Sequence, residues 1–134
     1  MLIETAPRVL LADSSPRMRR ILRVNLEGAG CQVIEVDVQD LQRQARSADV
    51  DALVINLDVR TTDVCDAVHA LRRRIPGAVV AGYSILPPDD TVRRLCIDMY
   101  VEKPFDLTVF VARLRRACER AQGPVHITRA TPTL

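Results

Sequence analysis

The sequence predicts an α/β protein in which a parallel β-sheet is covered by helices on both faces. Five short apolar runs rich in Val, Ile and Leu alternate with amphipathic segments along the chain. The runs show little polar alternation, which is typical of strands buried on both faces. Parallel strands need crossover connections, and the amphipathic segments supply helices for them. With 134 residues, the chain is long enough for one domain with a substantial core.

The predicted elements follow one another in a β-then-α order. Strands are expected at residues 8–12, 32–36, 52–57, 78–82 and 99–102. The first helix is the best defined, because apolar residues from Met18 to Leu26 recur at helical spacing. Ser15 can cap this helix, Pro16 suits its first position, and Gly28 and Gly30 end it. Further helices are expected at about 40–47, 64–75, 89–96 and 107–118.

Composition and charge describe a globular chain with no nucleic-acid signature. The chain is 48% hydrophobic and 27% charged, and its net charge of +2 is too small to indicate nucleic-acid binding. No apolar run approaches the roughly 20 residues of a membrane span. Residues 1–120 are predicted to form the domain. Residues 121–134 lose the helical periodicity and gain Gly, Pro and Thr, so they are predicted to be a mobile tail or linker.

The cysteines and the N-terminus predict a cytoplasmic location. The four cysteines are scattered and form no CxxC pair, so they are interpreted as reduced core residues. Residues 1–5 lack the basic and then apolar build of a signal peptide. No zinc-ligand spacing exists, and only His69 and His126 supply imidazoles.

Polar residues follow four of the predicted strands, and they are expected to share a pocket. Ligands of open α/β sheets bind at the carboxyl ends of the strands. Lys103, the only lysine, supplies a compact and mobile ammonium there. The other candidates are Asp13, Ser14, Asn56, Asp58, Tyr83 and Ser84. Two interpretations stay open at this point: a ligand pocket, or an Asp13–Lys103 ion pair that ties two loops together.

Motifs for nucleotide or hydrolase chemistry are missing from the sequence. There is no GxxxxGK[ST] loop, no GxGxxG loop and no GxSxG elbow. An enzyme that uses a cofactor is therefore disfavoured, and no resident cofactor is expected.

The order of the strand-end residues resembles the response-regulator receiver domain, the CheY-like family with a flavodoxin-like fold. Asp13 resembles the family's opening acid, Asn56 aligns with its phosphoacceptor, and Tyr100 aligns with its aromatic switch residue. Lys103-Pro104-Phe105 matches its terminal Lys-Pro-Phe, where the proline can form a cis bond. The resemblance covers roughly residues 7–120. It implies a doubly wound (βα)5 sheet with strand order 2-1-3-4-5 and a role in bacterial two-component signalling.

The chain departs from the family at the residues that carry its chemistry. Asn56 replaces the phosphoacceptor aspartate, Ser14 replaces the second acid, and residues 59–61 lack the usual proline. An amide is a poor nucleophile, and Mg²⁺ prefers carboxylate oxygens. The sequence therefore predicts an atypical receiver, or pseudo-receiver, that is not an enzyme. At most weak Mg²⁺ binding is expected, through Asp13 and Asp58, and Asp13 is expected to pair with Lys103.

Two questions about the pocket stay open from the sequence. Tyr83 and Ser84 both suit the family's switch hydroxyl. Asp58 lies two residues beyond Asn56 and shares its face if the strand continues, so the alternative is an active phosphoacceptor that uses Asp58 with Mg²⁺.

The resemblance also implies a surface for partners. It is the face of the predicted fourth helix, fifth strand and fifth helix, and it carries Arg93, Arg94, Tyr100, Arg113 and Arg116. The expected partner is a protein, either a sensor kinase, an effector or another regulator, and a homodimer through this face is possible. Neither nucleic acid nor a membrane is expected as a partner.

Overall fold

Five parallel strands form the centre of the molecule in the computed structural model, which describes residues 6–58 and 62–129. They are β1 (Arg8–Ala12), β2 (Gln32–Val36), β3 (Ala52–Asn56), β4 (Val79–Ser84) and β5 (Met99–Glu102). Neighbouring strands pair in the order β2-β1-β3-β4-β5, with every pair parallel. The predicted fold class and strand order are therefore confirmed.

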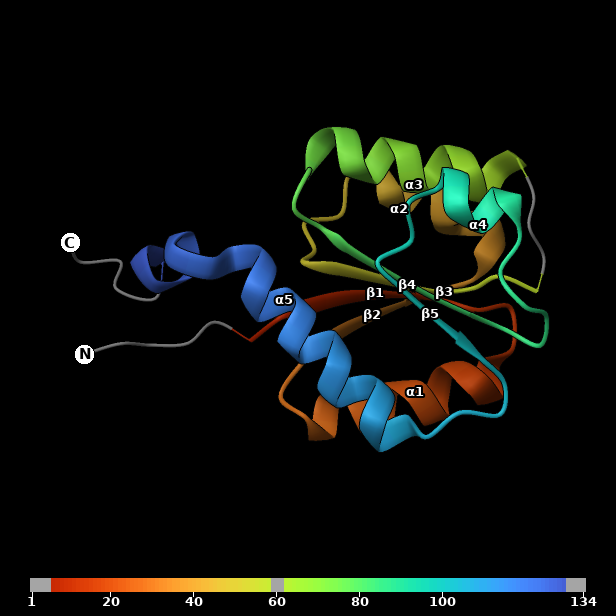
Figure 1. Cartoon of the computed structure of the whole chain (residues 1–134), viewed down its shortest axis with the longest axis horizontal. Helices are drawn as coiled ribbons and strands as arrows, with labels where there is room; N and C mark the ends of the chain where they lie inside the picture. Colours follow the sequence, from red (N-terminus) through yellow and green to blue (C-terminus); the bar gives the residue numbers. More distant parts are fainter. Residues whose placement is uncertain (1–5, 59–61, 130–134) are drawn as a thin grey trace.

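Helices cover both faces of the sheet. They are α1 (Pro16–Gly28), α2 (Leu41–Ala45) with a 3₁₀ turn η1 (Val38–Asp40) before it, α3 (Thr62–Arg74), α4 (Asp90–Arg94) and α5 (Leu107–Arg129). Figure 1 shows α1 and α5 on one face and α2, α3 and α4 on the other. Each right-handed crossover carries the chain to one of these layers.

Alternation along the strands builds a separate core on each face. Val9, Leu11 and Val54 belong to the cluster that packs on α1 and α5. Leu10 and Leu53 belong to the cluster that packs on α2, α3 and α4. Because side chains alternate between faces, the same rule decides where the polar residues at the strand ends point.

The predicted cap of α1 is confirmed, and α4 and α5 also start with side-chain caps. The Ser15 hydroxyl accepts a hydrogen bond from Met18 N–H at 3.2 Å. Asp89 and Asp106 cap α4 and α5 in the same way, with distances of 3.1 Å to the third following N–H in both cases. Gly30 has a φ of +89°, which glycine adopts without strain after a helix end.

Several boundaries differ from the prediction. β3 ends at Asn56, and β4 extends to Ser84, so Tyr83 and Ser84 lie within a strand. The predicted helix at 40–47 is divided into η1 and α2. The Lys103–Pro104 bond is cis.

The structure also changes the account of the tail and the cysteines. Residues 121–129 are helical as the end of α5, whereas the sequence predicted a tail there. Residues 1–5, 59–61 and 130–134, on which the signal-peptide, loop-proline and tail interpretations partly rest, lie outside the described residues. All four cysteines are free, but only Cys31 and Cys118 are buried, so the core assignment is wrong for Cys96, which is exposed. Across the described part of the chain, no helix combines the length and apolar character needed to cross a membrane.

Candidate functional site

Asp13 is the centre of a buried hydrogen-bond cluster at the carboxyl ends of β1, β3 and β4. Its side chain is almost fully buried, and one oxygen, Oδ2, accepts from the Tyr83 hydroxyl and from Asn56 Nδ2, the latter at 3.3 Å. The other oxygen, Oδ1, accepts from Ser15 N–H at 2.8 Å. Asn56 and Tyr83 are register partners on adjacent strands, so both side chains leave the sheet on the face of α1 and α5. We call Asp13, Asn56 and Tyr83 the Asp13 cluster.

Asp58 is the centre of a second, more exposed cluster. The Lys103 ammonium donates to Asp58 Oδ2 at 2.9 Å, and both side chains are about one-quarter exposed. Ser84 Oγ and Ile85 N–H each donate to Oδ1 at 2.8 Å. We call Asp58, Ser84 and Lys103 the Asp58 cluster. The sequence-predicted pocket is thus assembled as two neighbouring clusters.

The predicted Asp13–Lys103 ion pair is wrong, because Lys103 pairs with Asp58. The reason is a turn that the sequence did not reveal. β3 stops at Asn56, and the Asn56 side-chain oxygen accepts from Asp58 N–H at 2.8 Å, which folds the chain back at once. Asp58 therefore reaches the pocket from a turn and not from a continued strand face. The Lys103 nitrogen also lies 5.2 Å from the centre of the Tyr83 ring, within range of a cation–π contact.

The two hydroxyl candidates divide between the two clusters. Tyr83 points to the α1 and α5 face and donates to Asp13, whereas Ser84 points the other way and donates to Asp58. Ser14 leaves the pocket, since it is exposed and its hydroxyl lies 3.4 Å from Asp37 Oδ1. The sequence-predicted placement of Ser14 in the pocket is therefore wrong.

The residues of the predicted partner surface lie on α4, β5 and α5, as expected, and they are separate from the strand-end pocket. Tyr100 on β5 is half-buried, and its hydroxyl donates to the Leu86 carbonyl oxygen in the loop before α4. The four arginines of that surface, Arg93, Arg94, Arg113 and Arg116, are exposed.

The pKa of Tyr83 in the first cluster and the pKa of Asp58 in the second are shifted in opposite directions. Burial, and then the hydrogen bond to Asp13, raise the pKa of the Tyr83 phenol far above its ordinary value. Burial opposes ionisation of Asp58, but the hydrogen bonds from Lys103, Ile85 and Ser84 together hold its pKa below the ordinary value. Near neutral pH, Tyr83 is therefore a protonated donor and Asp58 an ionised acceptor.

The present residues do not fit the Mg²⁺ site that the receiver fold implies. Octahedral Mg²⁺ needs carboxylate oxygens that are free to bind it. Both oxygens of Asp13 and both oxygens of Asp58 already accept hydrogen bonds. Asn56 presents its amide nitrogen to Asp13, and Ser14 turns away from the pocket. Within residues 6–58 and 62–129, no group of three or more His, Cys, Asp or Glu residues could hold a metal ion.

We expect the Tyr83 phenol to stay protonated until the protein unfolds in alkali. A group whose folded pKa is raised contributes stability below its unfolded pKa of about 10 and loses it as the pH rises further. The test is a spectroscopic titration of Tyr100→Phe, in which Tyr83 is the only remaining tyrosine. Tyrosinate absorbance should rise together with the loss of helical circular dichroism. Tyrosinate that forms while the helical signal is intact would contradict the buried Asp13–Tyr83 hydrogen bond.

Comparisons with curated proteins find regulatory proteins of similar sequence. The chain is 32% identical over 115 residues to the transcriptional regulatory protein KdpE of Mycobacterium tuberculosis, over 84% of this chain and 51% of that protein. It is 30% identical over 117 residues to the KDP operon transcriptional regulatory protein KdpE of Escherichia coli, with the same coverage of 84% and 51%. The chain thus spans about half the length of the curated relatives it matches. No protein-family model matches it.

Solved structures share the fold at low sequence identity. The receiver domain of the Francisella response regulator 1452 has a TM-score of 0.72 at 20% identity, over 85% of this chain and 98% of that one. HP1043, an orphan response regulator of H. pylori, has a TM-score of 0.70 at 16% identity, over 87% and 98%. The fold is that of the CheY-like receiver domains. The matched relatives are named as transcriptional regulatory proteins, and the structural neighbours are response-regulator structures.

Proposed function

We propose that this chain is a degenerate receiver domain that signals through protein contacts without being phosphorylated. The observation that carries the proposal is Asn56, which stands at the end of β3 where the resembled family has its phosphoacceptor aspartate. Both ends of its amide are occupied, since Nδ2 donates to Asp13 and Oδ1 accepts from Asp58 N–H. An amide held in this way is neither a nucleophile nor a good metal ligand.

The Asp58 cluster supports the same proposal. In an active receiver, the lysine ammonium helps to neutralise a phosphoryl group. Here it faces Asp58 at 2.9 Å, within a cluster whose donors and acceptors are matched. A conformational switch needs a ligand that binds its two states with different affinity. Without a phosphoryl group, the pocket acts as a fixed structural tie between the loops after β3 and β5, and we assign the domain no enzymatic activity.

Output in this proposal depends on a constant surface made by α4, β5 and α5. This surface presents Tyr100 and the exposed arginines Arg93, Arg94, Arg113 and Arg116. The proposed partner is a sensor kinase, an effector or another regulator in the cytoplasm, and a homodimer through the same surface is the alternative. The proposed domain ends near residue 120, and α5 continues beyond it.

Asp58 carries a second candidate function, that of a phosphoacceptor. The observation in its favour is that Asp58 lies beside an ammonium and a hydroxyl, which are the two kinds of donor that stabilise a phosphoryl group. The observation against it is that each Asp58 oxygen already accepts from these donors. Phosphorylation would have to break contacts that the cluster has already formed.

Incubation with acetyl phosphate and Mg²⁺, followed by intact mass measurement, tests the proposal. We expect no phosphoryl adduct on the natural chain. We also expect none on Asn56→Asp, because Ser14 lies outside the pocket and leaves the metal site one acid short. An adduct that disappears in Asp58→Ala would overturn the proposal and establish the second candidate. An adduct that survives Asp58→Ala would refute both.

A further inference from the structure

A groove beside α5 lies away from the strand-end clusters and includes Arg113 and Arg116 of the proposed partner surface. It is formed between α5, the turn that joins α3 to β4, and the start of β5, and its volume is about 620 Å³. Its lining is four arginines and one acid, Asp98, together with small or slender residues, namely Pro76, Gly77, Ala78, Val79, Met99, Ala117 and Ala121. The start of β5 is the opposite end of that strand from Lys103, so the groove opens at the other edge of the sheet.

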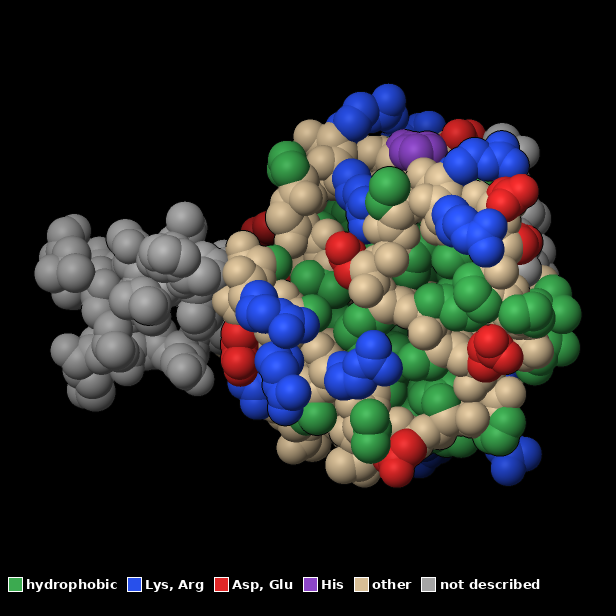
Figure 2. All heavy atoms as spheres, viewed as in Figure 1, with side chains coloured by type: hydrophobic (Ala, Val, Ile, Leu, Met, Phe, Trp, Pro, Cys, Tyr) green, Lys and Arg blue, Asp and Glu red, His purple; other side chains and the backbone are tan. Residues whose placement is uncertain are grey.

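Three arginines of α5 line this groove and have no side-chain partner among the residues that the structure describes. Arg113, Arg116 and Arg120 are spaced by three and four residues, which places them on one side of the helix. All three are exposed, and among the described residues they make no ion pair or side-chain hydrogen bond. Figure 2 shows Lys and Arg side chains gathered over α5 on this face of the molecule.

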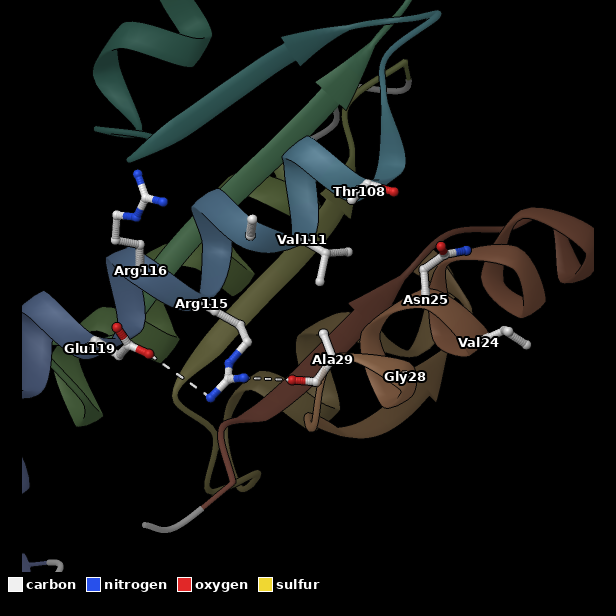
Figure 3. A pocket seen from close by; sticks show the side chains of 10 residues that line it. Val24, Asn25, Gly28, Ala29, Thr108, Val111, Arg115, Arg116 and Glu119 are labelled. Atoms are coloured by element: carbon white, nitrogen blue, oxygen red, sulfur yellow. Dashed lines mark hydrogen bonds and ion pairs between the residues drawn. The ribbon is translucent and has the colours of Figure 1, made fainter.

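Arg115, on the other side of α5, is an arginine with a structural contact. It donates to the Ala29 carbonyl oxygen at 2.8 Å and lies 3.9 Å from Glu119, so it connects α5 to the end of α1. Figure 3 shows Arg115 reaching toward Ala29, while Arg116 extends away from α1. The groove arginines differ from Arg115 in making no such contact with the described part of the chain.

On the side of the groove opposite α5, the charges of Arg72 and Asp98 neutralise each other. Arg72 donates to Asp98 Oδ2 at 3.0 Å and to the Cys96 carbonyl oxygen at 2.6 Å. Asp98 Oδ2 also accepts from Val80 N–H at 2.8 Å. The carboxylate of Asp98 is thus used by Arg72 and the backbone, and the positive charge of the three α5 arginines remains uncompensated in the groove.

We propose that this groove binds an acidic helical segment of a protein partner, with carboxylates spaced at i, i+3 and i+7 to meet Arg113, Arg116 and Arg120. The inference deepens the proposed function and rests on its assignment of a protein partner. Seven residues of helix span about 10 Å, so matching helical spacing lets three carboxylates meet three guanidinium groups. The small side chains of Gly77, Ala117 and Ala121 leave room for a second backbone beside α5.

Other occupants fit the lining less well. The groove has no aromatic side chain on which a base can stack, which disfavours a nucleotide. A symmetric second copy would place the arginine side of α5 against itself, and like charges at an interface are repulsive.

The test measures binding of a labelled helical probe peptide by fluorescence anisotropy. The probe carries glutamates at i, i+3 and i+7 on one side, and its matched peptide carries glutamines there. We expect the glutamate peptide to bind, and Arg116→Glu/Arg120→Glu to weaken its affinity by at least about tenfold. The matched control variant is Arg17→Glu/Arg20→Glu, which makes the same charge change at two exposed arginines of α1 and should leave binding nearly unchanged. Circular dichroism verifies that each variant is folded, and Arg116→Gln/Arg120→Gln repeats the test without charge reversal.

The remaining outcomes overturn the proposal. Equal binding of the glutamine peptide, or equal weakening by Arg17→Glu/Arg20→Glu, would show that general charge attraction explains the result. Absence of binding, or binding unaffected by the groove variants, would remove the groove as the site. Concentration-dependent dimerisation that the groove variants abolish, without peptide binding, would make a second copy the occupant. None of these outcomes involves a phosphodonor, so failure here is distinguishable from failure of the proposed function.

Discussion

Asp13→Ala is expected to lower the free energy of unfolding by about 3–5 kcal/mol, because several donors lose the buried carboxylate that accepts from them. The carboxylate is 1% exposed and accepts from Tyr83, Asn56 and Ser15. Its removal leaves the buried Tyr83 hydroxyl without an acceptor. Each unsatisfied buried donor costs about 1–3 kcal/mol. Urea denaturation followed by circular dichroism measures the change.

Tyr83→Phe is the matched control for this substitution. It removes one donor and keeps the ring, which packs 5.7 Å from the Phe105 ring between centroids. We expect a loss of only about 1–2 kcal/mol, because Asp13 keeps two of its donors. The double variant should cost less than the sum of the two single variants, since both remove the same hydrogen bond. An Asp13→Ala variant as stable as the natural chain would show that the Asp13 cluster does not stabilise the fold.

Lys103→Met is expected to destabilise the fold by about 1–3 kcal/mol, a typical cost for losing a charged hydrogen-bond partner at a partly solvated site. Asp58 would keep its donors Ser84 and Ile85 but lose the only cation that faces it in the cluster. The melting temperature should fall by several degrees. A carboxyl with a lowered folded pKa stabilises the protein above its unfolded pKa of about 3.9, and this stabilisation is lost as the pH falls through the folded pKa. The difference between the variant and the natural chain should therefore shrink in acid.

Two control variants identify the partner of Lys103. In an Asp58→Asn background, Lys103→Met should have little further effect, because the ion pair is already absent. In an Asp13→Asn background, the full effect should persist. The reverse result would restore the Asp13–Lys103 pair that the sequence predicted.

The strands and helix caps were predictable because their signals are local. Arg8–Ala12 and Met99–Glu102 are apolar runs whose ends coincide with the strands, and Ser15 and Asp106 lie next to the helices they cap. The end of α5 was not predictable, since Gly123 and Pro124 interrupt the periodicity on which a helix prediction depends, whereas the structure continues the helix to Arg129.

The members of the candidate site were predictable, but their pairing was not. Residues that follow parallel strands meet at one edge of the sheet. This rule predicted from the sequence that Asp13, Asn56 and Lys103 lie close together. Which carboxylate meets the ammonium depends on the turn at Asn56, and this is set by one side-chain hydrogen bond to Asp58 N–H. Arg113 and Arg116 were predicted on the partner surface, but the groove that they line together with Arg120 was missed, although the spacing of the three was a signal for it.

Lys103 carries the only side-chain amine in these 134 residues. Lys103 is therefore the only side chain in the sequence that a lysine-acylating reagent or enzyme can modify. Its ammonium nitrogen lies 2.9 Å from Asp58 Oδ2. Acetylation there would abolish the charge that faces Asp58 and so release the loop after β3 from the loop after β5. The rate at which an amine-reactive label attaches at Lys103 consequently reports how often these two loops separate.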